Sequence, residues 1–473
     1  MTTQAGSRSA LPTRDVRAPR IDRRRQYARR ARMSDLLVTL LWASGAASVA
    51  LYLAYGGMNA WNGPSGVITG LGIIAGLIGS DFVLIMLVLA ARVPVIDRTI
   101  GHDRAVATHR RLGKPALYLL LAHGALLLIG YGASTGLNPI AEIGPMLALP
   151  DMPLAFVGTA LFILVVVTSL VAVRRKFSYE GWHLVHLISY FAVIFALPHQ
   201  FSDSGMLATG TWQRIYWIAL YVLALAAIVV HRFLKPIVST FRHRITVAGT
   251  ETLSPGVVSI HLRGRNLRRL GSEGGQFLIW RFWTGKTWYH SHPISLSAMP
   301  SDSRARITVR ELGAGSSRIS AIPAGTAVSI EGPYGIFSDV ARTAPRLAII
   351  AAGIGVTPVR ALLENARIAP GEATVLLRAG NTDETYLWDE MGEIAAAKGA
   401  TLYKSIGHRS RGYSSWLAEK DARRGVTLQS IFPKLMQSDL YLCGPSSWLD
   451  AVEDEARALG IPEHQIHAER FDW

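Results

Sequence analysis

The chain has 473 residues, of which half are hydrophobic and 17% are charged, and its formal net charge is +16. This length is enough for about three domains. Cys443 is the single cysteine, which excludes an internal disulfide, a cysteine-ligated iron–sulfur cluster and a zinc–thiolate site. Any redox cofactor must therefore be held by other side chains.

The positive charge is concentrated near the N-terminus. Residues 1–32 contain ten arginines and two aspartates and contribute 10 − 2 = +8. Residues 92–114 supply further Lys and Arg, whereas residues 57–66 and 134–152 contain neither. This asymmetry follows the positive-inside rule and predicts a cell-membrane protein with its N-terminus in the cytoplasm. We expect the basic tail, residues 1–33, to attract anionic lipid and not nucleic acid.

Six segments of the first half are long and apolar enough to cross a lipid bilayer. They are residues 35–56, 67–91, 113–133, 153–173, 182–200 and 212–231. They predict a six-helix transmembrane domain over residues 34–234. Within the second segment, Asp81 is an intramembrane carboxyl, which serves either proton movement or a hydrogen bond inside the bundle.

Four histidines lie at matched depths in the third and fifth segments. His109 and His123 are fourteen residues apart, and His186 and His199 are thirteen apart. If both helices run from the cytoplasm outward, His109 lies opposite His186, and His123 lies opposite His199. The two pairs are then about 20 Å apart along the helices. Two histidines that face each other can bind a haem iron from both sides. The pattern predicts two b-type haems.

The thirteen-residue spacing fits an ideal helix poorly. It leaves His199 about 140° around the helix from His186, and we expect Pro198 to re-aim the second ligand by a kink. The alternative is that interior histidines only form hydrogen bonds with neighbouring helices. His183 has no partner at such a spacing and is interpreted in this second way.

The second half of the chain has the pattern of two further domains. Short β-rich runs separated by Gly, Pro and Asp predict an antiparallel β-barrel over residues 240–340. Strands that alternate with glycine turns and helices predict an α/β nucleotide-binding domain over residues 345–473. In AAGIGVTP, Gly353 and Gly355 follow a strand and precede a helix, as in turns whose backbone binds a pyrophosphate.

The motifs SHPISLSAMP, EGPYGIF, AAGIGVTP and YLCGP and an aromatic last residue occur in this order. Together they resemble the ferredoxin–NADP reductase superfamily, and more closely its membrane branch, the NADPH oxidases and ferric reductases. That branch carries a His-Pro-x-Ser/Thr flavin motif and histidine pairs with these two spacings. The resemblance covers roughly residues 34–473 and implies FAD, a nicotinamide cofactor and two haems.

The resemblance also implies roles for single residues. The residues implied to bind FAD are His292, Pro293, Ser295, Gly313, Ser316 and Ser317. Among them, the Ser295 hydroxyl lies near the reactive ring. Ala314 and Gly315 replace the acidic and aromatic residues that are usual in the flavin-phosphate segment, so the phosphate ligands stay open.

For the nicotinamide cofactor, the resemblance implies that one group binds the pyrophosphate and another lies under the nicotinamide. These groups are Gly353, Gly355 and Thr357, and Cys443, Gly444 and Pro445. Trp473 is implied to cover the flavin ring until the nicotinamide displaces it, the alternative being a frayed terminus. Arg378, Arg409 and Arg411 are candidate ligands of a 2′-phosphate and favour NADPH over NADH, although arginines on loops are often only solvated.

These inferences predict an oxidoreductase that passes electrons from cytoplasmic NADPH through FAD and two haems to a small-molecule acceptor outside the membrane. We expect a ferric or other metal chelate, because the chain shows no calcium-binding loops. The alternatives are superoxide formation from O₂ and donation to a periplasmic redox partner. No Lys or Arg occurs between Met33 and Ala91, which disfavours the oxidase. A non-enzymatic haem-sensing anchor and a flavin reductase with an empty bundle are the rival interpretations.

Overall fold

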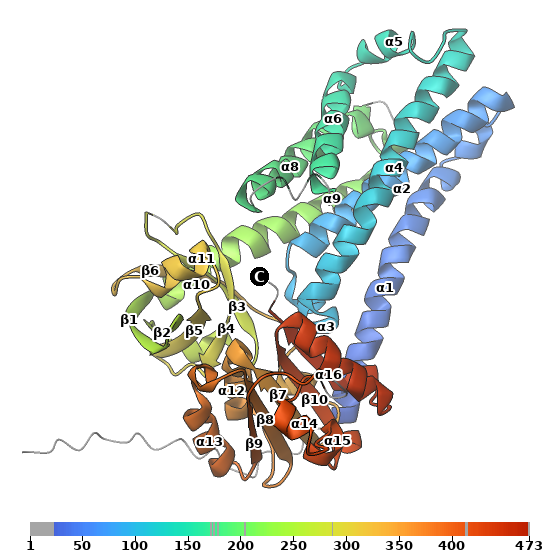
Figure 1. Ribbon diagram of the computed structural model, residues 1–473. Coiled ribbons are helices and arrows are strands. Elements are labelled where there is room, and N and C mark those ends of the chain that lie inside the picture. The colour runs from blue at the N-terminus through green and yellow to red at the C-terminus, as the bar shows by residue number, and fades with distance from the viewer. Residues whose placement is uncertain are drawn as a thin grey trace, which may run out of the picture.

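The computed structural model contains a bundle of long helices at one end and two sheets at the other (Figure 1). The part with the two sheets, residues 245–471, is called the reductase half after the resemblance described above. It describes residues 23–471 except 171–172, 174–175, 177–178, 203–204, 286 and 412–414. Trp473 and the first 22 residues of the basic tail lie outside the described residues.

Long helices form the first half of the described chain. They are α1 (Arg23–Ala54), α2 (Gly63–Ala90), α4 (His102–Thr135), α6 (Met152–Ser169), α8 (Tyr179–Ser202) and α9 (Trp212–Ile228), with the shorter α3 (Pro94–Ile100), α5 (Ile143–Leu147) and α10 (Lys235–His243). Among the described residues, 6 helices are long and apolar enough to cross a membrane. The predicted set of six apolar helices is confirmed. The first, third and sixth continuous helical spans, Arg25–Ala54, Arg104–Thr135 and Trp212–His243, are longer than predicted.

Small residues allow the helices of the bundle to pack in pairs. A Cβ atom on Gly72 of α2 would lie 3.1–3.3 Å from Leu126 and Leu127 of α4, and one on Gly158 of α6 would lie 2.8 Å from the Ala192 carbonyl oxygen of α8. Such close approach is the usual way in which membrane helices associate. The pairs α2–α4 and α6–α8 place the two histidine-bearing helices, α4 and α8, in different pairs (Figure 1).

Six antiparallel strands form the first sheet of the reductase half. They are β1 (Ile245–Ser254), β2 (Val257–Arg263), β3 (Phe277–Phe282), β4 (His292–Ala298), β5 (Arg304–Arg310) and β6 (Ala327–Tyr334). Their pairing runs in the order β1-β2-β5-β4-β3-β6 and returns to β1, so that they close into a ring, here called the β-ring. Trp280, Phe282 and Ile307 are fully buried inside it. The helix α11 (Ala314–Ser320) follows β5.

Five parallel strands form the second sheet. Their order is β11 (Ile466–Arg470), β10 (Ser438–Gly444), β7 (Arg346–Ala352), β8 (Ala373–Ala379) and β9 (Thr401–Ile406). The first of these strands in the sequence, β7, lies in the middle: β8 and β9 are added on one side of it and β10 and β11 on the other, so the strand order switches between β7 and β10. This is the doubly wound arrangement, in which ligands bind at the carboxyl ends of the strands beside the switch.

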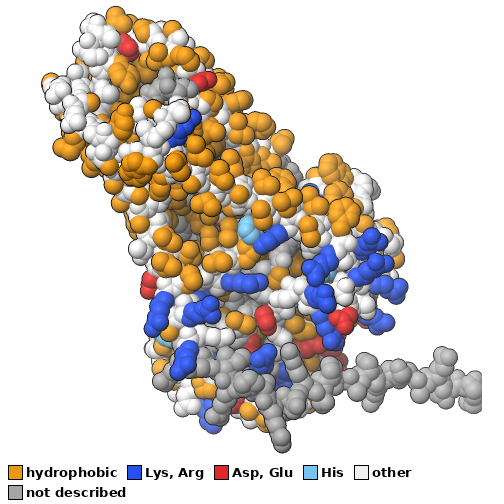
Figure 2. Space-filling view, turned by 180° about the vertical axis from the view of Figure 1, so that it is seen from behind, with side chains coloured by type: hydrophobic (Ala, Val, Ile, Leu, Met, Phe, Trp, Pro, Cys, Tyr) orange, Lys and Arg blue, Asp and Glu red, His pale blue; other side chains and the backbone are white. Residues whose placement is uncertain are grey.

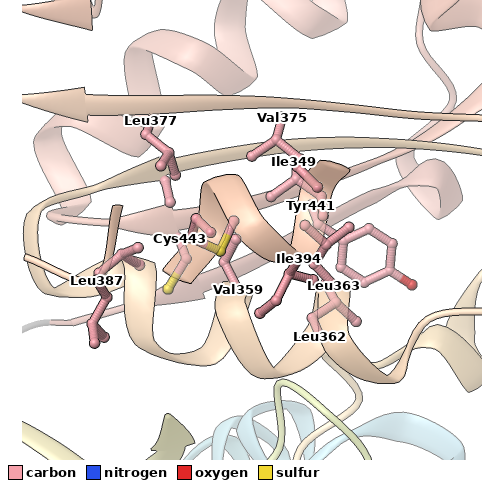
Figure 3. Packing of buried hydrophobic residues seen from close by; sticks show 14 of the residues in the cluster. Ile349, Val359, Leu362, Leu363, Val375, Leu377, Leu387, Ile394, Tyr441 and Cys443 are labelled. Carbon is pink, nitrogen blue, oxygen red and sulfur yellow. The ribbon is translucent and has the colours of Figure 1, made fainter. Parts of the chain in front are cut away.

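Helices cover this parallel sheet on both faces. They include α12 (Val356–Asn365), α13 (Trp388–Ala397) and α16 (Ser446–Ala458), with the short α14 (Glu419–Ala422) and α15 (Leu428–Ile431). Figure 3 shows Val359 and Leu362 of α12 against Ile349 and Val375 of the strands. The three central strands β7, β8 and β10 are therefore almost wholly buried and mainly apolar, as expected for a parallel sheet that is covered on both sides, whereas the edge strands β9 and β11 carry polar side chains.

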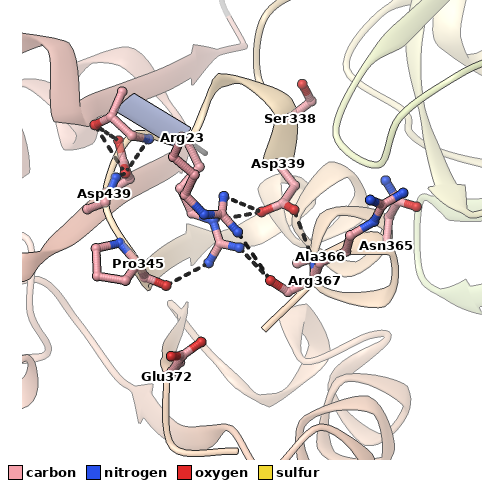
Figure 4. Close-up of polar contacts among 12 residues, drawn as sticks. Arg23, Ser338, Asp339, Pro345, Asn365, Ala366, Arg367, Glu372 and Asp439 are labelled. Atoms are coloured by element: carbon pink, nitrogen blue, oxygen red, sulfur yellow. Dashed lines mark hydrogen bonds and ion pairs between the residues drawn. The ribbon is translucent and has the colours of Figure 1, made fainter. Parts of the chain in front are cut away.

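The N-terminal part of α1 extends beyond the bundle and contacts the reductase half. The whole of α1 has 32 residues and spans about 48 Å, more than the roughly 30 Å of a hydrocarbon core. Arg23 forms an ion pair of 3.7 Å with Asp339 and donates a hydrogen bond to the Arg367 carbonyl (Figure 4). The Tyr27 ring lies 5.0 Å from the ring of His464. This helix therefore connects the bundle to the parallel sheet.

Glu390 of α13 links the β-ring to the parallel-sheet domain. Its two carboxylate oxygens accept hydrogen bonds of 2.8 Å from both Nη atoms of Arg306 in β5, and Arg360 of α12 donates a third of 2.5 Å. Burial alone would raise the pKa of Glu390, but the hydrogen bond from Arg306 and the charge of Arg360 hold it below its usual value. The carboxylate is therefore ionised at neutral pH.

We predict that Glu390→Gln lowers the melting temperature at pH 7, because it removes the carboxylate that pairs with Arg306 and one of the two carboxylates, Glu364 being the other, that pair with Arg360. Since the pKa is lower in the folded than in the unfolded state, the stabilisation is complete above about pH 4.3 and disappears as the pH falls through the folded-state pKa. The difference from wild type should shrink in acid, as measured by thermal unfolding. Glu393→Gln, an exposed change on the same helix, is the control. A difference that does not vary with pH would contradict the ion-pair explanation.

Candidate functional site

His109 of α4 and His186 of α8 face each other across the bundle. Their ring centroids lie 6.1 Å apart and the ring planes are inclined by 63°. Two imidazoles that bind one metal ion from opposite sides, with bonds of about 2 Å, also have centroids roughly 6 Å apart. The pair therefore has the separation that a single bis-histidine metal centre requires.

Backbone carbonyls of α2 orient both histidines of α4. The Nδ1 atom of His109 lies 3.1 Å from the Met86 carbonyl oxygen, and that of His123 lies 2.9 Å from the Gly72 carbonyl oxygen. Because a carbonyl can only accept, each Nδ1 must carry the proton, which leaves Nε2 with a lone pair when the imidazole is neutral. A hydrogen bond to the second ring nitrogen is the usual support of a metal-binding histidine.

His186 is held by side chains instead of carbonyls. Its Nδ1 atom lies 3.3 Å from the Ser169 hydroxyl of α6, to which the Trp182 indole also donates. The Trp182 ring lies 5.0 Å from the imidazole. These contacts fix the orientation of the ring toward α4.

His199 lies near His123 at the far end of the bundle, close enough for the two rings to interact electrostatically. From the sequence, a kink at Pro198 was expected to turn His199 toward His123 in spite of the thirteen-residue spacing. In the structure α8 continues as a helix through Pro198 to Ser202. The structure thus places His186 beside His109, whereas the pairing of His199 with His123 on one iron stays a prediction.

Gly76 of α2 provides the space for the outer histidine ring. A Cβ atom there would lie 2.4 Å from Nδ1 of His123, a distance that no real contact shows. A Cβ on Gly124, the neighbour of His123 in the sequence, would meet nothing within 4 Å. The role of Gly76 was not predicted from the sequence, where it is one of several glycines in an apolar segment.

Asp81 is 1% exposed in the middle of α2. One of its oxygens accepts a hydrogen bond of 2.6 Å from the Ser44 hydroxyl of α1, and the other has no partner among the described residues. The carboxyl is thus partly satisfied within the bundle, and both roles predicted for it stay predictions.

The described residues contain no cluster of three or more His, Cys, Asp or Glu side chains arranged to hold a metal ion. The bundle instead brings histidines together in pairs. A pair of imidazoles suits an iron whose remaining four ligands come from a porphyrin. The donor set therefore fits haem better than a bare metal ion.

The predicted flavin motif lies at the start of β4, beside α11. The Nε2 atom of His292 and the hydroxyl of Ser295 are buried and have no partner among the described residues. His292 lies 3.7 Å from where a Cβ on Gly315 would stand, so the HPIS strand and the glycine turn adjoin. Buried polar atoms without partners call for an explanation, and the polar atoms of a flavin would supply such partners. Burial and the nearby charge of His290 lower the pKa of His292 to about 4, so its ring is neutral at pH 7.

The other predicted flavin residues take simpler positions. Pro293 pairs with Ile279 in the β-ring, and Gly313 precedes α11. The Ser316 and Ser317 hydroxyls both donate to the Gly313 carbonyl, 3.0 and 3.1 Å away. The two serines thus cap their own turn.

Two glycine turns meet at the carboxyl ends of β7 and β10, the two parallel strands between which the strand order of the sheet switches. A Cβ on Gly355 would lie 2.2 Å from the carbonyl oxygen of Cys443, so only glycine allows this approach. Gly353 has a left-handed φ of 53°. The Thr357 hydroxyl donates to the Ile354 carbonyl and closes the turn. The structure therefore brings together the two motifs predicted to hold the nicotinamide cofactor.

Cys443 and the C-terminal segment lie at this same edge. The Cys443 side chain is fully buried, and burial raises the pKa of its thiol well above the usual value, so the thiol stays protonated. Pro445 precedes α16. The Phe471 amide donates to the Gly444 carbonyl over 3.4 Å, which places the last described residue beside the end of β10.

The three arginines predicted to bind a 2′-phosphate differ in their surroundings. Arg378 is 4% exposed and donates to the carbonyls of Ala379 and Gly407. Arg409 and Arg411 are exposed, and the Nε atom of Arg409 donates to the Ser415 carbonyl over 3.1 Å. Arg409 and Arg411 are therefore accessible to a phosphate, whereas Arg378 already has backbone partners.

Arg310 and Tyr386 were not predicted as site residues. They approach the first glycine turn, 3.6 and 3.9 Å from where a Cβ on Gly353 would stand. Arg310 comes from the β-ring and pairs with Glu384 over 3.1 Å. Such residues cannot be found from the sequence, because they belong to no motif and reach the turn only in the folded chain.

Comparison with protein families agrees with this geometry. Residues 75–197 match the ferric reductase like transmembrane component, and residues 349–454 match the oxidoreductase NAD-binding domain. This chain combines a ferric reductase-like transmembrane domain with a ferredoxin reductase-type FAD/NAD-binding module. It is thus a membrane-linked, NAD(P)H-dependent flavin oxidoreductase.

Curated relatives match the reductase half. The toluate 1,2-dioxygenase electron transfer component of Pseudomonas putida is 27% identical over 240 residues, which cover 48% of this chain and 67% of that protein. Ferredoxin–NADP reductase B of Sorangium cellulosum is 30% identical over 181 residues, covering 35% and 70%. The solved FAD/NAD-binding domain of nitric oxide dioxygenase from Vibrio cholerae is 24% identical, with a TM-score of 0.39, and covers 48% of this chain and 98% of that domain.

We predict that Gly76→Ala displaces the His123 ring and lowers the haem content, whereas Gly124→Ala leaves it unchanged. Both changes add one methyl group to a helix interior, where alanine is favoured over glycine by about 1 kcal/mol, so helix propensity does not separate them. Haem per chain in the purified protein is the measurement. Equal haem content in the two variants would show that Gly76 does not shape a haem site.

Proposed function

We propose that this protein carries electrons from cytoplasmic NADPH across the cell membrane through FAD and two b-type haems. The observation that carries the proposal is the facing pair His109 and His186, at the end of the bundle that joins the reductase half. When bound, FAD would supply the conversion of a two-electron hydride donor into single electrons, and bis-histidine haems would supply one-electron carriers. His109 and His186 would hold one haem, and His123 and His199 the other.

The start of α4 connects the inner histidine pair to the β-ring. The His102 ring stacks on Tyr334 of β6 with a centroid distance of 5.7 Å. His109 follows seven residues later on the same helix, a rise of about 10 Å. The inner pair is therefore the one near the proposed flavin site, and His123 lies about 21 Å beyond His109.

Glu331 of β6 joins the two halves by charge. Its Oε2 atom accepts hydrogen bonds of 2.7 Å from Arg92, which follows α2, and of 3.1 Å from Arg232, which follows α9. The Arg92 guanidinium also lies over the Tyr334 ring at 5.4 Å. All three charged side chains are largely buried, so solvent screens the contact weakly. This contact would fix the distance between flavin and inner haem.

A ferric or other metal chelate is the proposed acceptor, because the connections at the far end of the bundle are short and leave room for a small molecule. Superoxide formation from O₂ is the second candidate. The sequence argument against superoxide formation was that no Lys or Arg occurs between Met33 and Ala91, and it did not consider arginines later in the bundle. In the structure, Arg214 of α9 lies at the far end, 5.1 Å from the Phe201 ring, and donates to the Leu207 carbonyl. An arginine at this end favours the second candidate.

The proposal is tested by an anaerobic visible spectrum before and after NADPH, with haem counted per chain. We expect two haems with reduced b-type bands in the wild type, and partial loss of haem in His109→Ala and in His123→Ala. His183→Ala, which changes a histidine outside the two pairs, should keep both haems. A protein without haem, or with haem that NADPH never reduces, would leave only a flavin reductase.

We predict that Glu331→Gln slows reduction of the haems by NADPH and leaves reduction of ferricyanide, which takes electrons directly from the flavin, unchanged. The amide has no charge to hold Arg92 and Arg232, so the β-ring loses its fixed position under the bundle. Stopped-flow absorbance separates the two rates. The matched control is Glu251→Gln on β1, which breaks an exposed ion pair with His261 of β2. If both rates fall together, Glu331 stabilises the fold and does not position the flavin.

The acceptor is decided by comparing ferric citrate with O₂ under NADPH turnover. Each NADPH supplies two electrons, so an oxidase should release two superoxide ions per NADPH. For a metal-chelate reductase we expect ferrous product in this ratio and little superoxide. Full superoxide yield, and its loss in Arg214→Gln, would replace the metal-chelate proposal by the oxidase.

A further inference from the structure

One continuous helical segment carries apolar side chains from the bundle to the β-ring. The helix α9, the π-helical segment η3 (Val229–Leu234) and α10 follow one another without a break. Together, Trp212–His243, they have 32 residues and would span about 48 Å, against a hydrocarbon thickness of about 30 Å. The last turns must therefore leave the hydrocarbon core or run along its surface.

These last turns are apolar where a water-exposed helix would be polar. Between 49% and 71% of the surface is exposed in each of Phe233, Leu234, Ile237, Val238 and Phe241. Their spacing of one, four, five and eight residues places them on one helical face. Another face of α10 packs on β6. An apolar patch of this kind marks an interaction surface.

The loop between β3 and β4 adds aromatic side chains on the same side of the β-ring. Trp283, Trp288 and Tyr289 are 49–52% exposed. The Trp283 amide donates to the Ala327 carbonyl over 2.9 Å and its indole to the Ser329 hydroxyl over 3.1 Å. Both acceptors belong to β6, the strand on which α10 packs. Trp and Tyr are the residues enriched at the membrane–water interface.

Basic side chains border this surface. Arg242 and Arg244 are exposed at the end of α10, directly before β1. In the β-ring, Thr246 of β1 and Trp283 after β3 both contact Ala327 of β6. The start of β1 and the end of β3 are thus about two strand spacings, or about 10 Å, apart. Figure 2 shows Lys and Arg gathered on the reductase half next to the apolar surface of the bundle.

We propose that the apolar face of α10 and the aromatic β3–β4 loop lie in the phospholipid leaflet on the reductase side, and that Arg242 and Arg244 bind its anionic headgroups. The surface continues the exposed apolar side chains of α9, including Ile215 and Val222, on a helix that is apolar enough to cross a membrane. Its basic border matches the negative charge of anionic lipid. The leaflet would hold the β-ring at a fixed depth.

The single cysteine makes a direct depth measurement feasible. Because Cys443 is fully buried, a spin label attaches selectively to an introduced cysteine. Phe241→Cys and Trp288→Cys report on the proposed surface. The matched control is Met436→Cys, in the reductase half, where the native side chain is 55% exposed. The full chain is placed in nanodiscs of phosphatidylcholine with or without phosphatidylglycerol, and collisions with O₂ and with a water-soluble nickel chelate are compared.

We expect labels at 241 and 288 to be shielded from the chelate and accessible to O₂, by about tenfold in their ratio relative to the label at 436, because O₂ partitions into the bilayer. Labels as accessible to the chelate as the control would overturn the proposal. Labels shielded from both reagents would also overturn it, since a second copy of the chain or another protein would then cover the surface.

The role of the headgroups is tested in the same nanodiscs. Arg242→Gln with Arg244→Gln should reduce the immersion of the label at 288 in phosphatidylglycerol, and Arg423→Gln, an exposed change elsewhere in the reductase half, should not. Immersion that depends neither on phosphatidylglycerol nor on the two arginines would remove the headgroup part of the proposal. This measurement needs no electron transfer and is independent of the proposed function.

Discussion

The carboxylate of Glu331 accepts hydrogen bonds from Arg92 and Arg232, and this contact joins the helix bundle to the β-ring. Arg92 and Arg232 follow two membrane-spanning helices, whereas Glu331 belongs to the β-ring. Charges removed from water in this way interact strongly, and removal of one partner leaves the others uncompensated. The contacts of His102 with Tyr334 and of Arg23 with Asp339 add to the joint but depend on the same placement of the two halves.

The bundle uses glycine and histidine together. Glycines let α2 approach α4 closely, and this approach brings the carbonyls of Met86 and Gly72 to the histidine rings. The same carbonyls determine which ring nitrogen carries the proton and leave the other one free. Helix packing and preparation of the ligands are thus one arrangement, in which a single added methyl group at Gly76 would disturb both.

Much of the architecture was predictable because its signals are local. Six apolar runs, the alternation of strands and glycine turns, and four histidines in two spaced pairs are all visible along the chain. Three features were not predictable. The hydrogen bond of Arg378 to the Gly407 carbonyl, the approach of Arg310 to the first glycine turn, and the space that Gly76 leaves for His123 each join segments far apart in the sequence.

The sequence by itself determined which segments are apolar, where the glycine turns fall and which side chains are able to bind a metal, because hydrophobicity, backbone freedom and ligand chemistry belong to single residues. Only the tertiary structure decided which ring nitrogens of His109 and His123 carry the proton, which glycine makes room for the His123 ring and which charges join the two halves. Those properties depend on distances of a few ångströms between helices and strands, and such distances are set by packing of the whole chain.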